Sequence, residues 1–127
     1  PIYCNDIETA EHEILIISPF MRKNRVTQMT KVLSKALINS ISVTIVTRPP
    51  EDFKDKNSET VIQITETLNS YGIKVVYKSN FHQKFTVIDQ KIVWYGSVNF
   101  LSFGTAEESI MRLTSSDIAG ELTDTVL

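Results

Sequence analysis

The sequence has little of what several common kinds of site require. It contains one cysteine, Cys4, and two histidines, which excludes an internal disulfide framework and disfavours a zinc site. No apolar run approaches the ~20 residues that a membrane span needs, and the N-terminus has no signal-peptide pattern. We therefore expect a cytoplasmic protein that is not held together by disulfides and does not enter a membrane.

The chain also has no overall excess of positive charge. Its net charge of -2 argues against a generally basic nucleic-acid-binding protein, although "MRKNR" at 21–25 is a local basic segment. Taken alone, this segment is more typical of a solvated loop and helix start than of a binding patch. Hydrophobic residues make up 42% of the chain and charged residues 22%, which is ordinary for a folded domain.

The length of 127 residues fits one domain with its own core, spanning residues 1–127. The sequence contains no internal repeat and no low-complexity linker. It begins at Pro1 rather than Met, as expected of a piece excised from a longer chain. Other domains of such a parent chain are therefore among the expected partners.

The first part of the sequence alternates between predicted strands and helices. Near-continuous apolar or β-branched runs predict strands at 13–20, 42–50 and 73–79. Apolar residues at helical spacing predict amphipathic helices at 26–40 and 59–72. This β-α-β-α-β order indicates a parallel sheet covered by helices.

The pattern then changes. Two strand-like segments, 81–88 and 91–100, are separated by two residues, which predicts an antiparallel hairpin. A further strand is predicted at 108–114, followed by a closing helix that starts at Ser116 or Asp117. The predicted fold class is α/β, with a mixed, mainly parallel β-sheet flanked by helices.

The register of the hairpin decides whether its polar residues meet. With the turn at 89–90, His82 pairs with Ser97 across the hairpin. A shift of one residue would send the polar groups of the two strands to opposite faces. The residues that the predicted register brings to one face are His82, Lys84, Ser97 and Asn99.

Such a cluster suits the chemistry of a phosphoryl group. A neutral imidazole is a nucleophile and proton carrier near neutral pH, and an ammonium two residues away supplies charge for an anionic oxygen. A hydroxyl and an amide add donors of fixed direction, and Gly96 lets the backbone come close. Each residue also has an ordinary structural interpretation, such as a turn former for Asp89.

The stretch has the form H-x-K-x(4)-D-x(6)-G-S-x-N, and it resembles the HKD motif of the phospholipase D superfamily. The positions that carry the motif are His82, Lys84, Asp89, Gly96, Ser97 and Asn99. Members of this superfamily include lipases, lipid synthases, nucleases and restriction enzymes. The predicted order of elements suits its mixed-sheet fold, so the resemblance covers most of the chain, with 81–100 as an antiparallel HKD hairpin.

The resemblance implies a metal-independent phosphodiesterase that acts without a cofactor through a covalent phosphohistidine. His82 would attack phosphorus. Lys84 and Asn99 would hold the nonbridging oxygens, with assistance from Ser97.

Two acidic positions would have supporting roles. Asp89 is expected to fix the turn and the local charge rather than to touch substrate. The resemblance also implies an acid on the following strand that orients the nucleophilic histidine. Glu108 is the preferred candidate for it, and Glu107 is the alternative.

The reaction of this superfamily uses two HKD sites, and the present chain has one motif. The other histidine, His12, has no lysine two residues on, and we interpret it as the exposed end of a helix or strand. A single-motif chain needs a second copy of His82 as general acid for the leaving oxygen. We therefore expect a homodimer with one composite active site at its two-fold axis.

Small single-motif members of the superfamily resemble nucleases more than lipases, and they are often appendages of restriction endonucleases or helicase-like proteins. DNA is therefore the first expected substrate, with 21–25, Arg48 and Lys78 contacting the phosphate backbone. One alternative is a nucleic-acid-binding or targeting module that keeps the phosphate pocket but turns over little. A lipid phosphodiesterase is less favoured, because no amphipathic membrane-facing segment stands out.

Overall fold

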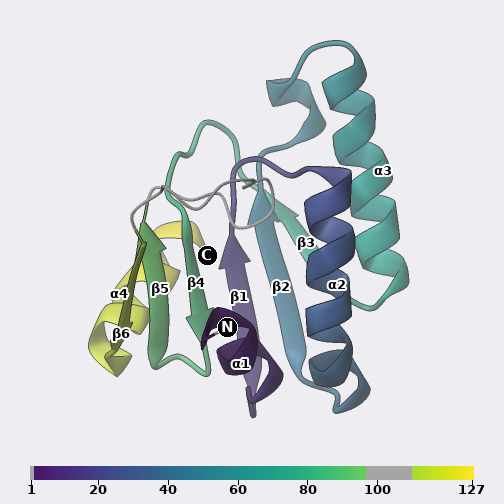
Figure 1. Cartoon of the computed structure of the whole chain (residues 1–127). Helices are drawn as coiled ribbons and strands as arrows, with labels where there is room; N and C mark the ends of the chain where they lie inside the picture. The colour runs from purple at the N-terminus through teal and green to yellow at the C-terminus, as the bar shows by residue number, and fades with distance from the viewer. Residues whose placement is uncertain (1, 97–109) are drawn as a thin grey trace.

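The apolar segment "EILII" forms β1 (Glu13–Ile17), which lies inside a six-stranded sheet of order β3-β2-β1-β4-β5-β6. The computed structural model describes residues 2–96 and 110–127 (Figure 1). β1 pairs in parallel with β2 (Ser42–Thr47) and antiparallel with β4 (Phe85–Ile88). The sheet is therefore mixed, as predicted, but it is not mainly parallel, since two of the described pairings are parallel and three are antiparallel. β1 separates its parallel half from its antiparallel half.

The parallel half follows the predicted β-α-β-α-β order. β3 (Lys74–Tyr77) pairs in parallel with β2, and the connections contain α2 (Lys23–Ile38) and α3 (Lys56–Ser70). The short 3-10 helix η1 (Pro50–Asp52) lies between β2 and α3, and its first residue was predicted as the end of the strand at 42–50. The apolar sides of the two long helices are buried against the sheet through Val26, Met29, Leu33, Ala36, Ile64 and Leu68.

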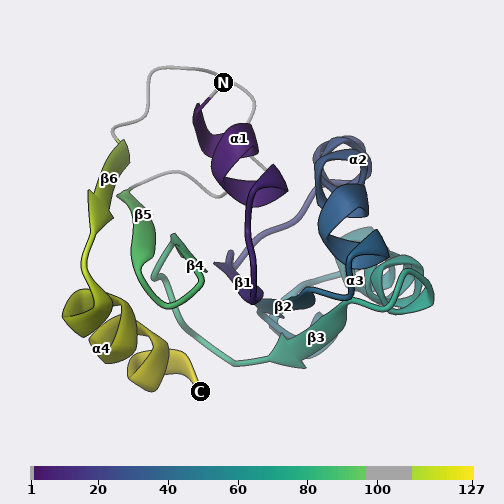
Figure 2. The ribbon, with the colours of Figure 1, turned by 90° about the horizontal axis from the view of Figure 1, so that it is seen from below.

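The antiparallel half consists of β4, β5 (Ile92–Gly96) and β6 (Ile110–Thr114). It is followed by α4 (Ser116–Val126), whose start is capped by the Ser115 hydroxyl, which accepts the main-chain N–H of Ile118. Figure 2 shows α4 on one face of the sheet and α1, α2 and α3 on the other. β4 is buried along its whole length because both faces of the sheet are covered at this strand.

The helices in the described part of the chain are all too short or too polar to cross a lipid bilayer.

The predicted hairpin register is wrong by one residue. The turn lies where it was predicted, since Asp89 and Gln90 both have positive φ and the Lys91 N–H is donated to the Ile88 carbonyl. However, Ile88 pairs with Ile92 instead of Lys91. Lys91 is a third residue of the turn, before β5 begins at Ile92, and it moves every later pairing by one position. Phe85, and not Lys84, therefore lies opposite Tyr95.

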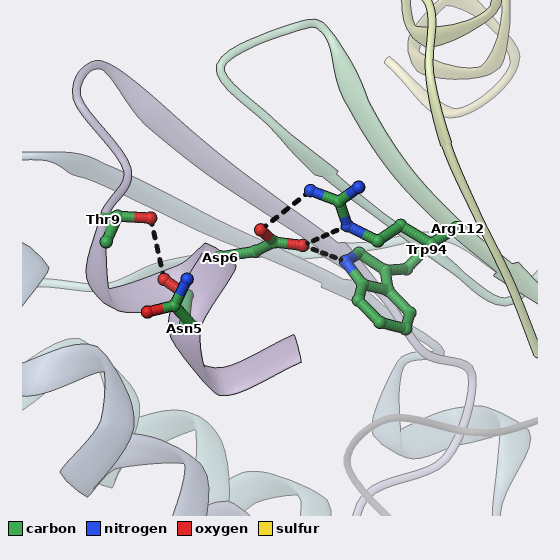
Figure 3. Close-up of polar contacts among 5 residues, drawn as sticks. All are labelled: Asn5, Asp6, Thr9, Trp94 and Arg112. Carbon is green, nitrogen blue, oxygen red and sulfur yellow. Dashed lines mark hydrogen bonds and ion pairs between the residues drawn. The ribbon is translucent and has the colours of Figure 1, made fainter. Parts of the chain in front are cut away.

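A short N-terminal helix, α1 (Ile2–Glu8), was not predicted from the sequence. Its Asp6 carboxylate accepts the Trp94 indole N–H at 2.8 Å and two N–H groups of Arg112 at 2.7 and 3.0 Å (Figure 3). The Tyr3 ring meets the Trp94 ring edge-on at 5.3 Å. These contacts hold α1 against β5 and β6.

The Asp89 carboxylate fastens the hairpin turn to the start of β1. It accepts the main-chain N–H groups of Glu11, His12 and Glu13 at 2.7 to 3.2 Å. Burial alone would raise the pKa of the Asp89 carboxyl, but these three N–H donors outweigh it and hold the pKa below its usual range. His12 itself is exposed and lies directly before β1, which agrees with its predicted place at the end of an element.

We expect Asp89→Asn to lower the free energy of unfolding by about 1.5–3 kcal/mol at pH 7, because a neutral amide loses these charge-assisted hydrogen bonds. The folded-state pKa of Asp89 is depressed, so its contribution is present above the unfolded pKa of about 3.9 and is lost as the pH falls through the lower folded value. Urea unfolding at pH 7 and at pH 3 should therefore show a smaller difference between wild type and variant at pH 3. Glu11→Gln, which removes an exposed charge beside the same turn, is the control; an equal difference at both pH values would contradict this role.

A second prediction concerns the anchor of α1. The Arg112 guanidinium, aided by the Trp94 N–H and opposed by burial, holds the pKa of Asp6 below its usual range, so Asp6 is ionised at neutral pH. Asp6→Asn should lower the free energy of unfolding by about 1–3 kcal/mol, since Trp94 loses a charged acceptor. Trp94 is the one tryptophan of the chain, so its fluorescence reports both the local change and thermal unfolding. The exposed neighbour Glu8 gives the control Glu8→Gln, and equal effects of the two variants would contradict the anchor.

Candidate active site

One edge of the sheet gathers connections that are far apart in the sequence. β1, β2 and β3 end at this edge, and β4 begins there because it runs antiparallel to β1 (Figure 1). In open α/β sheets, ligands bind outside the carboxyl ends of the strands where the strand order or direction changes. The residues immediately before β4, which include His82 and Lys84, lie at this edge.

His82 and Lys84 precede β4 and are not part of it. The strand was predicted to begin at 81, but pairing starts at Phe85. His82 is exposed, and the half-buried Lys84 ammonium donates to the His82 carbonyl at 3.1 Å. An ammonium has three donors, so this contact leaves Lys84 with further donors for an anion. The segment therefore places an accessible imidazole close to an ammonium group that is held by a hydrogen bond.

The residues around His82 are fixed to other elements. Phe81 is buried among the side chains between the sheet and α4. The Gln83 amide donates to the Thr125 hydroxyl of α4 at 2.9 Å. Asn80 has a positive φ of 56° and donates its main-chain N–H to Asp52 at 3.0 Å. His82 is thus an exposed residue between anchored neighbours, although it lies outside regular secondary structure.

The connection between β2 and α3 contributes a compact polar and aromatic group at the same edge. Arg48 donates to Asp52 at 2.9 Å and to the Asn80 side chain at 3.3 Å. Its guanidinium lies 5.7 Å from the centre of the Phe20 ring and 5.9 Å from that of Phe53. Arg48 was predicted as a phosphate contact, and Asp52 and Asn80 were not identified from the sequence. The i,i+4 spacing of Arg48 and Asp52 was the one available signal.

The second half of the motif begins beside Lys84. Gly96, the last residue of β5, donates its main-chain N–H to the Lys84 carbonyl at 3.4 Å. The predicted site residues Ser97, Asn99 and Glu108, together with the alternative Glu107, lie outside the described residues. The corrected hairpin register no longer supports their convergence with His82, which stays a prediction that rests on the motif resemblance alone.

Asp89 lies at the other end of β4, in the turn that leads to β5. Four strand residues separate this turn from the start of β4, a distance of roughly 13 Å along the strand. Its carboxylate is occupied by the main-chain N–H groups before β1. The structure therefore does not bring Asp89 together with His82.

Three basic residues lie near this edge. Arg22 and Lys23, at the start of α2, are exposed, and Lys78 is half-buried just after β3. Within residues 2–96 and 110–127, no group of three or more His, Cys, Asp or Glu side chains is arranged to hold a metal ion. A pocket between α2 and α3 includes none of the predicted catalytic residues, although Lys23 of the basic segment is in its lining, which is Lys23, Val26, Thr27, Gln63, Ile64 and Thr67.

Comparison with protein families gives a match over nearly the whole chain. The model of the family described as "Cardiolipin synthase, PLD-like domain" matches residues 3–126. No curated protein sequence matches significantly. The matched range contains the exposed His82, the held Lys84 and the whole sheet described above.

Solved structures share the fold at low sequence identity. Nuc from Salmonella typhimurium, a phospholipase D family member, has a TM-score of 0.73 at 21% identity, over 98% of this chain and 81% of that one. NucT from Helicobacter pylori has a TM-score of 0.74 at 18% identity, over 97% of this chain and 81% of that one. TrmBL2, an archaeal chromatin protein, has a TM-score of 0.64 at 13% identity, over 98% of this chain and 45% of that one. These likenesses confirm the predicted mixed-sheet α/β fold.

Proposed function

Because the chain belongs to the PLD-like domain family, we propose that it is a metal-independent phosphodiesterase that cleaves DNA through a covalent phosphohistidine. The observation that supports this most directly is the exposed His82 next to the held Lys84 ammonium, at the sheet edge where β1, β2 and β3 end. An accessible imidazole can reach phosphorus, and an adjacent ammonium stabilises the charge that develops on the nonbridging oxygens.

In the proposed reaction, a ring nitrogen of His82 attacks phosphorus and forms a P–N bond while the bond from phosphorus to one bridging oxygen breaks. A second, protonated His82 gives its proton to that leaving oxygen. The same second imidazole then takes a proton from water, which attacks phosphorus and releases His82 and a phosphate monoester. Lys84 and Asn99 would hold the nonbridging oxygens, with Ser97 assisting and Glu108 orienting the imidazole.

The second His82 is proposed to come from another copy of this chain. The one other histidine, His12, lies before β1, and the Asp89 turn to which its main chain is bound is at the end of β4 remote from His82. A two-fold axis that passes beside His82 would place two identical imidazoles opposite each other. The homodimer would then hold one composite site.

DNA is preferred as substrate because of the basic residues at the site edge. Arg22 and Lys23 are exposed at the start of α2, and the half-buried Lys78 follows β3. Such residues bind the phosphate backbone without reading sequence. Arg48 is bound to Asp52 and Asn80, so it is a less suitable phosphate contact than its sequence position indicated.

A second candidate function is a nucleic-acid-binding module with little catalysis. The specific observation in its favour is the shared fold of TrmBL2, a chromatin protein whose structure is described as showing a novel mode of DNA binding. Such a module would keep the basic edge and bind DNA without requiring His82.

We expect wild type to cleave nonspecific DNA in the presence of EDTA, and His82→Ala to reduce the rate by at least about 1,000-fold, because the covalent step is lost. Gel assays of plasmid and single-stranded DNA measure this. His12→Ala, which changes the other exposed histidine, is the matched control and should leave the rate unchanged. DNA binding without cleavage by wild type would favour the binding module, and hydrolysis of phosphatidylcholine vesicles instead of DNA would indicate a lipid phosphodiesterase.

The composite site predicts a non-linear loss of activity in mixed dimers. When wild-type and His82→Ala chains are co-expressed in equal amounts, about one quarter of the dimers contain two intact histidines, so activity should fall to about one quarter. Independent sites would give about one half. Co-expression with His12→Ala controls for expression, and sedimentation gives the oligomeric state. A monomer that cleaves DNA at micromolar concentration would overturn the composite site.

A further inference from the structure

The Asp52 carboxylate connects the segment after β2 to the turn before His82. One of its oxygens, Oδ2, accepts both the Arg48 Nε–H at 2.9 Å and the main-chain N–H of Asn80 at 3.0 Å. A second donor of Arg48, Nη2, reaches the Asn80 side-chain oxygen at 3.3 Å. Asn80 is therefore held through both its main chain and its side chain by residues 28 or more positions earlier in the sequence.

Asn80 is the point at which the chain changes direction toward His82. Its φ of 56° is in the left-handed region, which asparagine tolerates better than most residues. Phe81, the next residue, is only 5% exposed, and it turns its ring into the core on the α4 side of the sheet. His82 follows, with its Cα no more than about 7 Å from that of Asn80. The conformation of Asn80 therefore affects the course of the main chain that leads to His82.

The group that holds Asn80 is itself fixed. The Arg48 guanidinium is close to the rings of Phe20 and Phe53, which meet at 75° with their centres 5.8 Å apart. The hydrogen bond from Arg48, followed by that from the Asn80 N–H, holds the pKa of Asp52 below its usual range. Asp52 is consequently ionised at neutral pH and makes charge-assisted hydrogen bonds, which are short and directional.

We propose that Asp52, held by Arg48, is a positioning residue for the nucleophile: through the Asn80 turn it fixes the imidazole of His82 in the orientation that reaches phosphorus. This role rests on the phosphodiesterase function proposed above. It is separate from the acid on the following strand that the resemblance implies, because Asp52 acts through the main chain before His82 and lies in η1, after β2. Misplacement of a reacting group by about 1 Å can cost 100-fold in rate. A small loss of order at Asn80 should therefore be enough to lower the cleavage rate measurably.

The direct test is Asp52→Asn, with Glu51→Gln as matched control. Both substitutions remove one negative charge from η1, but the exposed Glu51 is not part of the group that holds Asn80. Cleavage of a labelled oligodeoxynucleotide in EDTA should show kcat lowered about 10- to 100-fold by Asp52→Asn, with KM changed less than about 3-fold. The control should match wild type. An unchanged kcat, or a rise in KM alone, would overturn the proposal.

A second pair of variants tests the turn itself. Asn80→Gly keeps the main-chain N–H and adopts positive φ without strain, whereas Asn80→Ala is strained in that conformation. We expect Asn80→Gly to keep a kcat several-fold higher than that of Asn80→Ala, while thermal unfolding shows both folded at the assay temperature. Equal kcat values for the two variants would count against the Asn80 turn as the means of positioning.

A measurement that does not need turnover separates this proposal from the proposed function. Backbone ¹⁵N relaxation should show that residues 80–82 lose order in Asp52→Asn and keep it in Glu51→Gln. If wild type does not cleave DNA but this loss of order is seen, the nuclease function fails and Asp52 still fixes the His82 segment. If wild type cleaves DNA and order and kcat are both unchanged in Asp52→Asn, the positioning role fails alone.

Discussion

The structure depends on β1 pairing in opposite senses on its two sides. One neighbour, β2, runs parallel to it, and the other, β4, runs antiparallel. A strand that is paired on both edges and covered on both faces has to be apolar throughout, and residues 14–17 are all at most 4% exposed. The antiparallel pairing carries the start of β4 to the edge where β1, β2 and β3 end. His82 and Lys84 lie at that edge because of this reversal of direction.

Three aspartate carboxylates, those of Asp6, Asp52 and Asp89, have two different structural roles. Asp6 of α1 binds Trp94 of β5 and Arg112 of β6, and Asp89 binds the main chain before β1 at the end of β4 remote from His82. Asp52 lies at the His82 edge and binds the chain just before the proposed nucleophile. Specific hydrogen-bond donors hold all three carboxylates in the ionised form. Each of these charges therefore acts on its own neighbours, although the net charge of the chain is only -2.

Much of this fold could be predicted from the sequence, because the informative patterns are local. The apolar runs and helical spacings gave β1, β2, β3, α2 and α3, and the spacing of the motif led to the family that the comparison confirms. The hairpin register could not be predicted, since the choice between pairing Lys91 or Ile92 with Ile88 depends on a single extra residue in the turn. The helix α1 has seven residues, and its stability comes from tertiary contacts, so its own sequence gives a weak signal.

The candidate site was less predictable than the fold for a related reason. His82 and Lys84 were found because they lie two residues apart in a recognisable pattern. The contacts that hold this segment join residues 28 to 42 positions apart, such as Asp52 with Asn80 and Gln83 with Thr125. Such pairs follow from the topology of the sheet, and nothing in their immediate sequence distinguishes them from ordinary surface residues.

The ion pair between Asp6 and Arg112 has a consequence for the order in which the molecule assembles. Its two partners are 106 residues apart, so the contact closes almost the whole chain into a loop. A helix as short as α1 has little stability in isolation, and it obtains its partners only when β5 and β6 are in place. During synthesis on a ribosome, α1 is therefore made well before β5 and β6, but it is fixed in place only after these two strands have paired.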